Sequence, residues 1–487
     1  MLTLADPKVL QRDAYVDGAW VPAGAGGRFA VHNPATGETL AEVADLDAAD
    51  ARAAIEAAAA ALSAWSARTA KDRAAVMRKW FELIMAAQED LAQLMTAEQG
   101  KPLAETRGEV AYGASFLEWF AEEGRRAYGD VIPTHAPGKR ILVLKQPVGV
   151  VTAITPWNFP MAMITRKVAP ALAAGCTIVV KPPDETPLSA LALAELAGRA
   201  GVPKGVVNVV TTSRAKEVGL ELTQNPLVRK FSFTGSTEVG KLLMAQCATT
   251  VKKVSLELGG NAPFIVFDDA DLDQAIEGAL ASKYRNMGQT CVCANRFLVH
   301  ASIYDAFERK LAARVKTMKV GNGAEAGVTQ GPLITPDAVE KVERLLADAV
   351  AHGAKVEVGG NRHPLGRTFF EPTIVTDVTP AMAISREEIF GPVATLTRFE
   401  GEAEAVRMAN DTEYGLAAYF YARDIGRIFR VAEALEYGMV CVNDGILSTE
   451  VAPFGGVKAS GLGREGSKYG IDEYLEIKYV LLGGLGA

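Results

Sequence analysis

Short β-branched and apolar runs alternate with helical stretches through the middle of this 487-residue chain. The first series of runs covers residues 148–154, 177–180, 206–210 and 230–233. Runs at this spacing are typical of βαβ units, in which helices join parallel strands. A second series follows Gly260 and covers residues 264–267, 297–299 and 393–399. We therefore expect an α/β protein with parallel sheets in two domains.

The residues before the first series have helical patterns. Ala48 to Ala64 is rich in Ala and contains no Gly or Pro, which favours a helix. Asp72 to Gln99 carries apolar residues at helical spacing over its first half. Tyr128 to Gln146 contains two prolines and the apolar run 141–144, and this pattern predicts a hairpin outside both domains.

Composition excludes several classes of protein. The net charge of -7 leaves no basic surface for nucleic acid or anionic membranes. No apolar run is long enough to cross a bilayer, and charges near the N-terminus argue against a signal peptide. Five cysteines, an odd number, favour a reducing cytoplasm over a disulfide framework. We expect no metal site, because CxxC pairs and clustered histidines are absent from the sequence.

Cys291 and Cys293 lie in a polar run, Gly-Gln-Thr-Cys-Val-Cys-Ala-Asn, rather than in an apolar core. A cysteine in such a loop is placed for reactivity, since the thiolate is the nucleophile. The alternative is two small residues in an ordinary turn.

Two further segments carry candidate catalytic groups. Glu257 follows an apolar stretch and precedes a Gly pair, and burial would raise its pKa toward the range of a general base. Asn158 lies between prolines and aromatics after a predicted strand, where its amide is suited to an oxyanion hole. A structural salt bridge and a turn asparagine are the respective alternatives.

Together these segments resemble the aldehyde dehydrogenase superfamily. The resemblance extends from Asp17-Gly18-Ala19-Trp20 through Phe233-Thr234-Gly235-Ser236-Thr237 to Pro453-Phe454-Gly455-Gly456. It implies a Rossmann-type cofactor domain (1–127 and 148–257), a catalytic domain (258–445) and a return segment lining the active site (446–469). It also implies a small oligomerisation domain (128–147 and 470–487) and a homo-oligomer, dimer or tetramer.

The resemblance also implies a mechanism. Cys291 would attack the aldehyde, and the Asn158 amide would hold the oxyanion. Glu257 would then activate the water that hydrolyses the thioester. Lys167 and Glu476 would relay the proton, although a surface salt bridge is the alternative for each.

The cofactor site has no standard fingerprint, because no G-x-G-x-x-G follows a strand. A strand instead enters a Gly-Ser-Thr turn whose following helix has N-terminal amides suited to a diphosphate. The resemblance implies a nicotinamide cofactor, NAD or NADP, and no metal. An acid at Asp184 would repel a 2′-phosphate by about 1 kcal/mol in water, which favours NAD slightly. The implied cofactor contacts are Thr155, Pro156, Trp157, Lys181, Asp184, Gly235, Ser236, Gly259, Glu388 and Phe390.

The catalytic loop and the segment 460–470 are more similar to succinate-semialdehyde dehydrogenases than to general members. Arg166, Arg285 and Ser448 match the positions that this subfamily uses to bind the distal carboxylate, and an Arg fork binds a carboxylate bidentately. Glutarate semialdehyde, one methylene longer, stays open as the substrate, because one methylene changes specificity only about 10–200-fold. A broader aldehyde range also stays open.

Other hypotheses concern Cys293 and the class of reaction. Cys293 could form a reversible disulfide with Cys291, although so small a ring would be strained. A CoA-acylating dehydrogenase would use Cys291 but generally lacks a base at the position of Glu257. A non-catalytic protein on the same scaffold would not need Cys291, Glu257 and Asn158 together.

Overall fold

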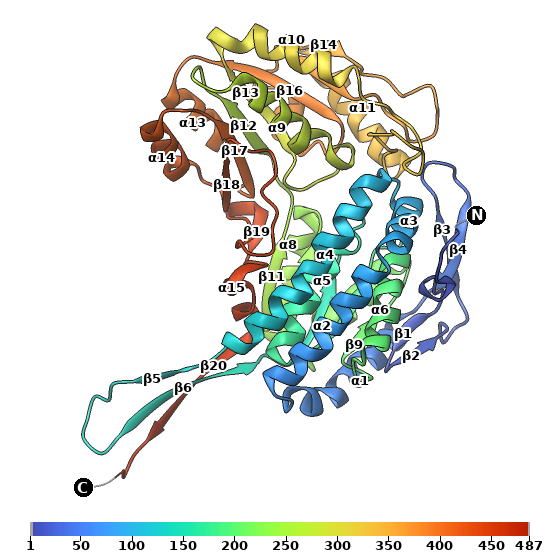
Figure 1. The fold of residues 1–487 in the computed structure, drawn as a ribbon, viewed down its shortest axis with the longest axis vertical. Helices are drawn as coiled ribbons and strands as arrows, with labels where there is room; N and C mark the ends of the chain where they lie inside the picture. Colours follow the sequence, from blue (N-terminus) through green and yellow to red (C-terminus); the bar gives the residue numbers. More distant parts are fainter. Residues whose placement is uncertain (1–2, 486–487) are drawn as a thin grey trace.

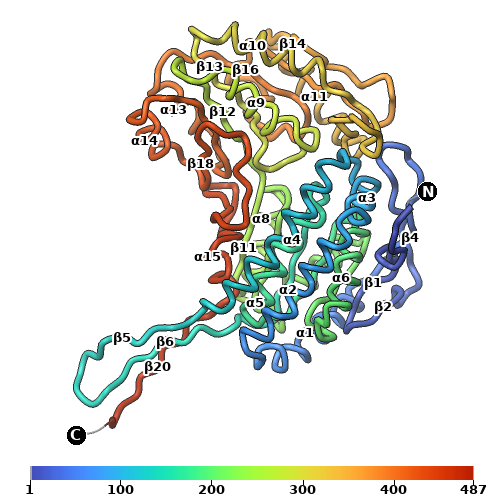
Figure 2. The backbone as a smooth tube through the Cα atoms, in the orientation of Figure 1, coloured from blue at the N-terminus to red at the C-terminus, as the bar shows by residue number. Residues whose placement is uncertain are grey.

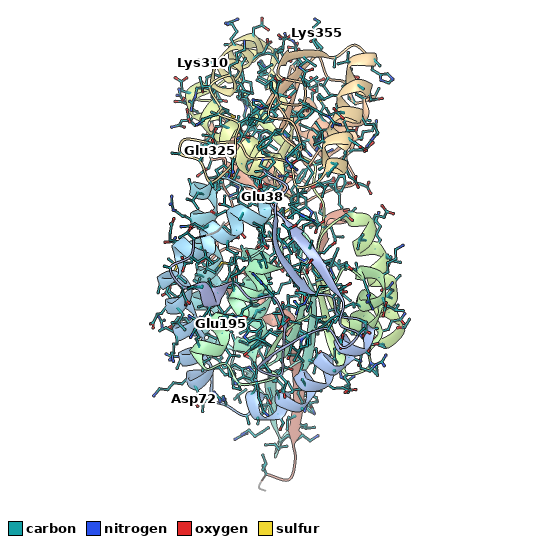
Figure 3. The ribbon with its side chains drawn as sticks, turned by 90° about the vertical axis from the view of Figure 1, so that its right-hand side faces the viewer. Glu38, Asp72, Glu195, Lys310, Glu325 and Lys355 are labelled. Atoms are coloured by element: carbon teal, nitrogen blue, oxygen red, sulfur yellow. The ribbon has the colours of Figure 1, made fainter. Side chains whose placement is uncertain are left out.

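The computed structural model describes residues 3–485, so residues 1–2 and 486–487 of the predicted domains lie outside it. Two sheet-containing lobes are stacked, and a long hairpin projects from the lower lobe (Figure 1). The side view labels Lys310, Glu325 and Lys355 on the upper lobe, and Asp72 and Glu195 on the lower lobe (Figure 3). The fold confirms the expected α/β class with two largely parallel sheets.

The first sheet has eight strands, and its five central strands, from β11 to β9, are parallel. Its order is β19 (Gly461–Leu462), β11 (Lys253–Glu257), β10 (Val228–Thr234), β7 (Val150–Ile154), β8 (Thr177–Lys181), β9 (Val207–Val209), β1 (Ala14–Val16) and β2 (Ala19–Val21). The chain leaves β7 toward β8 and β9 and then returns to the other side at β10. This reversal of strand order is where α/β sheets bind ligands.

Helices cover both faces of this sheet, and β8 shows why the strand is apolar throughout. Ile178 and Val180 pack into the core beneath α5 and α6, whereas Val179 packs beneath α1. Alternate side chains of a parallel strand point to opposite faces, so both faces must be apolar when both are covered. The helices are α1 (Ala48–Ser66), α2 (Ala70–Ala86), α3 (Gln88–Gln99), α4 (Leu103–Glu123), α5 (Ala162–Ala174), α6 (Leu188–Ala200), α7 (Ala215–Gln224) and α8 (Thr237–Cys247).

The helical pattern from Asp72 to Gln99 is interrupted in the structure. α2 ends at Ala86 and α3 begins at Gln88, because Ala87 has a non-helical ψ of 13°. Alanine favours a helix, so the sequence contains no local signal for this break.

The second sheet has seven strands, and all neighbours are parallel except β14 and β15. Its order is β14 (Lys355–Val358), β15 (Thr373–Thr376), β16 (Val393–Phe399), β13 (Ala294–His300), β12 (Ala262–Val266), β17 (Ala417–Tyr421) and β18 (Met439–Val442). The helices that follow β12 are α9 (Leu272–Tyr284), α10 (Tyr304–Val315), α11 (Pro336–Ala351), α12 (Ala383–Arg386), α13 (Glu402–Asn410), α14 (Ile425–Ala434) and α15 (Ser467–Gly470).

Two smaller sheets complete the fold. The projecting sheet joins β5 (Asp130–Ile132), β6 (Arg140–Pro147) and β20 (Leu475–Leu482), so the predicted hairpin pairs with the C-terminal strand (Figure 2). β3 (Arg28–His32) and β4 (Thr39–Ala44) form a separate pair near the N-terminus. Within residues 3–485, no helix is both long and apolar enough to cross a membrane.

Candidate active site

A cavity of about 290 Å³ brings the predicted thiol and the predicted carboxylate-binding residues together. It lies where α4, the start of α5, the cysteine loop and the segment 446–454 meet. Its lining includes Cys291, Arg166, Arg285, Ser448, Tyr112, Phe159, Phe454 and Glu105. One cavity therefore contains a nucleophile, two guanidinium groups and apolar walls.

The cysteine loop is held in an unusual backbone conformation. Asn286 and Met287 have φ values of 50° and 57°, in the left-handed region that non-glycine residues rarely adopt. The Asn286 N–H donates to Glu105 Oε2 at 2.8 Å, and its side chain donates to the Asn158 carbonyl at 3.0 Å. A Cβ at Gly260 would lie 2.5 Å from the Cys291 carbonyl, so glycine is required beside the loop. This network fixes the position of the thiol.

Cys291 is partly exposed to the cavity. Burial raises the pKa of its thiol to about 12, although Arg166 opposes the shift. A thiol with this pKa is protonated at neutral pH, so it would need a base to accept its proton before it could act as a nucleophile.

We expect iodoacetamide to alkylate Cys291 slowly at pH 7 and about tenfold faster per pH unit up to pH 10. Below its pKa a thiol gains thiolate tenfold per pH unit, and the thiolate is the reactive form. Mass spectrometry of the peptide containing Cys291 measures the rate, with a Cys291→Ser variant as the control. A plateau near pH 8 would contradict the raised pKa.

Asn158 is fixed by a buried ion pair between Lys101, just before α4, and Glu109 on α4. Its Nδ2 donates to the Gln289 carbonyl at 3.0 Å, so one of its two N–H groups is engaged and the other is free to donate. Lys101 Nζ donates to the Asn158 carbonyl at 2.6 Å and to Glu109 Oε2 at 2.5 Å. Glu109 in turn accepts from the backbone N–H groups at the start of α5. A preorganised donor of this kind suits an oxyanion.

Glu257 ends β11 with its carboxylate buried. Neither of its oxygens has a hydrogen-bond partner among the described residues. Burial and the nearby Glu465 raise its pKa well above the ordinary value, against Arg166 and Lys167. An unengaged carboxylate with a raised pKa is suited to accept a proton at neutral pH.

The structure does not bring Glu476 to Lys167. Lys167 Nζ donates to Glu465 Oε1 at 2.5 Å and to Thr234 Oγ1 at 2.7 Å. Glu476 lies on β20 and pairs instead with Lys253 at 3.5 Å, with about half of its side chain exposed. β20 belongs to the projecting sheet, which directs its side chains away from the cavity. The carboxylate partner of Lys167 is therefore Glu465.

The two predicted carboxylate-binding arginines differ in their surroundings. Arg166 Nη2 lies 2.7 Å from Glu465 Oε2, and its guanidinium lies 3.9 Å from the Phe454 ring centroid, so its charge is already paired. Arg285 forms no ion pair with a carboxylate within residues 3–485, and its guanidinium lies 5.3 Å from the Phe159 ring centroid. Arg285 is therefore the more available cation for a bound anion.

Glu105 adds a negative group to the same wall. Burial raises its pKa to about 7, while Lys101 and Arg285 oppose the shift. Because it lines the cavity near Arg285, a charged Glu105 would weaken the attraction of this wall for an anion.

The predicted cofactor residues lie at the carboxyl ends of the first sheet. Thr155 follows β7, Lys181 ends β8, and Gly235 follows β10. Ser236 caps α8, with its Oγ accepting the Val239 N–H. The Thr155 hydroxyl is buried without a partner among the described residues, as expected of a group that a ligand would satisfy. The amides at the start of α8 suit a diphosphate.

The remaining cofactor candidates occupy the same region. Glu388 Oε1 accepts the Gly260 N–H at 3.0 Å, and burial raises its pKa to about 7. A Cβ at Gly259 would lie 2.8 Å from Glu388 Oε2, so this approach needs glycine. The Phe390 ring packs edge-on against Trp157 at 5.6 Å between centroids. These groups suit the nicotinamide end of a dinucleotide, next to Cys291.

The adenosine end would lie near β8. Lys181 is buried, its Nζ donates to the Pro182 carbonyl at 3.1 Å, and burial lowers its pKa. Asp184 is exposed, so water and salt reduce its repulsion of a 2′-phosphate.

Cys293 does not face the cavity. Its Sγ is buried and lies 3.4 Å from the Lys283 carbonyl. The Tyr419 hydroxyl donates to the carbonyl of the intervening Val292 at 2.8 Å. A disulfide with Cys291 would require this turn to rearrange, and the reversible switch stays a prediction.

Several residues that organise the site were not predicted from the sequence. They act by holding other groups: Lys101, Glu105, Glu109, Asn286, Gln289, Tyr419 and Glu465. Lys101 and its partner Asn158 are 57 residues apart in the sequence, so no local pattern links them.

Known proteins are similar to this chain in sequence and in fold. The sequence model of the aldehyde dehydrogenase family matches residues 20–480. A glutarate-semialdehyde dehydrogenase from Pseudomonas aeruginosa is 66% identical, with 99% of this chain and 100% of the relative covered. The NADP(+) succinate-semialdehyde dehydrogenase GabD from Escherichia coli is 62% identical, with 99% and 100% covered. The crystal structure of succinate-semialdehyde dehydrogenase from Burkholderia pseudomallei superposes with a TM-score of 0.98 at 63% identity, covering 99% and 100%.

Proposed function

Because this chain belongs to the aldehyde dehydrogenase family, we propose that it oxidises succinate semialdehyde to succinate with a nicotinamide cofactor. The cavity that joins Cys291 to Arg285, Arg166 and Ser448 is the observation that carries this proposal. It pairs a nucleophile with a cationic wall, which an aldehyde with a distal carboxylate requires.

The chemistry follows from the positions of three groups. Cys291 attacks the aldehyde carbon, and the free N–H of Asn158 stabilises the developing oxyanion. When bound, a nicotinamide cofactor supplies the hydride acceptor. Cys291 then carries the acyl group as a thioester, and Glu257 takes a proton from the water that hydrolyses it. The presence of Glu257 favours water over CoA as the acyl acceptor.

Substrate length is the less constrained part of the proposal. Relatives are named for succinate semialdehyde and for glutarate semialdehyde, which differ by one methylene. Such a difference typically changes kcat/KM by about 10–200-fold, so one pocket can accept both. We favour the four-carbon substrate and keep the five-carbon one as the alternative.

The decisive experiment is an absorbance assay for reduced nicotinamide. It compares succinate semialdehyde, glutarate semialdehyde and butanal, each with NAD and with NADP, in wild type and Cys291→Ala. A signal that depends on Cys291 and is strongest with the carboxylated aldehydes would support the proposal. Faster oxidation of butanal would overturn the proposed substrate class.

Cofactor preference depends on Asp184 in this proposal, with NAD slightly favoured. Asp184→Ser should lower the KM for NADP about fivefold, since removing one negative charge relieves about 1 kcal/mol of repulsion. The KM for NAD should change less than twofold. Steady-state assays at low salt and at 0.5 M salt measure both, and the NADP effect should shrink at high salt. An unchanged KM for NADP would exclude this role.

The projecting sheet supports a homo-oligomer, dimer or tetramer. Apolar side chains on it are largely exposed in the single chain, among them Val131 at 73%, Ile477 at 73% and Tyr479 at 59%. Exposed apolar groups in such number mark an interaction surface. A cytoplasmic location stays a prediction from the cysteine content.

A further inference from the structure

Polar side chains follow one face of two neighbouring strands in the first sheet. Lys230, Ser232 and Thr234 alternate with Phe231 and Phe233 along β10, and all five are buried. Central parallel strands are normally apolar on both faces. On β10 only the phenylalanine face is apolar, where it packs with α8.

The neighbouring strand β11 carries the matching polar residues. In the parallel register, Lys230 pairs with Lys253, Ser232 with Ser255, and Thr234 with Glu257. Because paired residues of parallel strands point to the same side, the six side chains form one polar row. We call these six residues the polar track, and its inner end is the proposed general base.

Hydrogen bonds connect each end of the track. At the inner end, Thr234 accepts from Lys167, which also donates to Glu465. At the outer end, Lys230 Nζ donates to Ser255 Oγ at 2.5 Å, and Ser255 Oγ donates to Glu473 Oε2 at 3.0 Å. The Glu473 side chain is 29% exposed, so the track reaches water.

Ser232 occupies the middle position. Its hydroxyl is buried and forms no hydrogen bond of ordinary geometry among the described residues, although the Tyr474 side chain lies close to it. A hydroxyl can donate and accept at once, so it can bridge both ends directly or through a water. In Figure 1, β11, β19 and α15 lie between the upper lobe and the base of the projecting sheet. Glu473 belongs to the short turn Asp472–Tyr474, which directly precedes β20.

The proposed reaction generates protons in this buried region. Aldehyde, oxidised cofactor and water give carboxylate, reduced cofactor and two protons. One proton comes from the Cys291 thiol and the other from the attacking water through Glu257. Each must leave before the next turnover.

We propose that the polar track carries the proton from Glu257 to water at Glu473, with Lys230 and Ser255 as its outer relay. This inference rests on the proposed function. Burial lowers the pKa of Lys230 to about 8, while Glu473 opposes the shift, so this ammonium can release and regain a proton near neutral pH. A lysine that only anchored the two strands would not need a pKa near neutral pH.

Stopped-flow measurements on the full chain test the relay. Succinate semialdehyde and cofactor are mixed with enzyme in weak buffer, and reduced nicotinamide and a pH-indicator dye are followed together. In Glu473→Gln and Ser255→Ala, the first turnover should stay within about twofold of wild type. Steady-state turnover and proton release should slow about three- to tenfold at pH 6.5, with a larger solvent deuterium isotope effect.

Asp472→Asn is the matched control, because it removes an adjacent exposed carboxylate that pairs with Lys145 on the surface. It should behave as wild type. Wild-type turnover and isotope effect in both Glu473→Gln and Ser255→Ala would overturn the relay. Equal slowing of the first turnover and the steady state would also overturn it, since that pattern indicates a structural role. Absence of reduced nicotinamide in wild type would instead refute the proposed function.

Discussion

Glu257→Gln should give one equivalent of reduced nicotinamide per active site, followed by turnover about 1,000-fold slower than wild type. A positioned general base contributes typically 10²–10⁴-fold. Glutamine keeps the shape of the side chain but cannot accept the proton of water. The acyl group would therefore stay on Cys291, and rapid-quench mass spectrometry should find the thioester.

A second variant is needed to interpret this result. Cys291→Ser should not form even the first equivalent of reduced nicotinamide (the burst), because a serine hydroxyl is a far weaker nucleophile at neutral pH. Loss of the burst in Glu257→Gln as well would mean that Glu257 also takes the proton of the Cys291 thiol. Wild-type turnover in Glu257→Gln would exclude Glu257 as the base.

The pH profile should follow the same carboxylate. The pKa of Glu257 is raised well above its ordinary value, so the base is protonated and inactive at low pH. Steady-state turnover should therefore rise with pH through a value above the ordinary range of a glutamate.

Local sequence patterns were sufficient to predict several strands of both sheets and three candidate catalytic groups. The β-branched runs predicted β7, β8 and β10, because parallel strands covered on both faces must be apolar at successive positions. Cys291, Glu257 and Asn158 lie in short motifs that resemble the family, so each could be proposed as a candidate without knowledge of its neighbours in space. The break at Ala87 had no such signal.

Ion pairs and strand pairings between segments far apart in the sequence could not be predicted from it. Lys167 and Glu465 are 298 positions apart, and the sequence reasoning placed the relay carboxylate at Glu476 instead. Both are glutamates near the C-terminus, and only the path of the chain decides which one reaches Lys167. Likewise, the alternation of Lys230, Ser232 and Thr234 is visible in the sequence, but their pairing with β11 requires the sheet register.

Charge pairing also guides which arginine we expect to bind substrate. Arg166 lies between Glu465 and Phe454, so its removal would leave a buried carboxylate short of a partner and disturb Glu257. Arg285 lines the cavity without an ion-pair partner among the described residues, so its removal should affect substrate binding more selectively.

Arg285→Gln should lower kcat/KM for succinate semialdehyde about 100-fold, because losing one partner of a buried, charge-assisted contact costs roughly 3 kcal/mol. Activity toward butanal, which has no carboxylate, should stay within about threefold. The kcat/KM of Arg285→Lys for succinate semialdehyde should lie between the values for wild type and Arg285→Gln, since lysine restores the charge but not the bidentate fork. Steady-state assays with both aldehydes measure these ratios. Because Arg285 directly precedes the strained Asn286, an equal loss with butanal would show that it supports the cysteine loop instead.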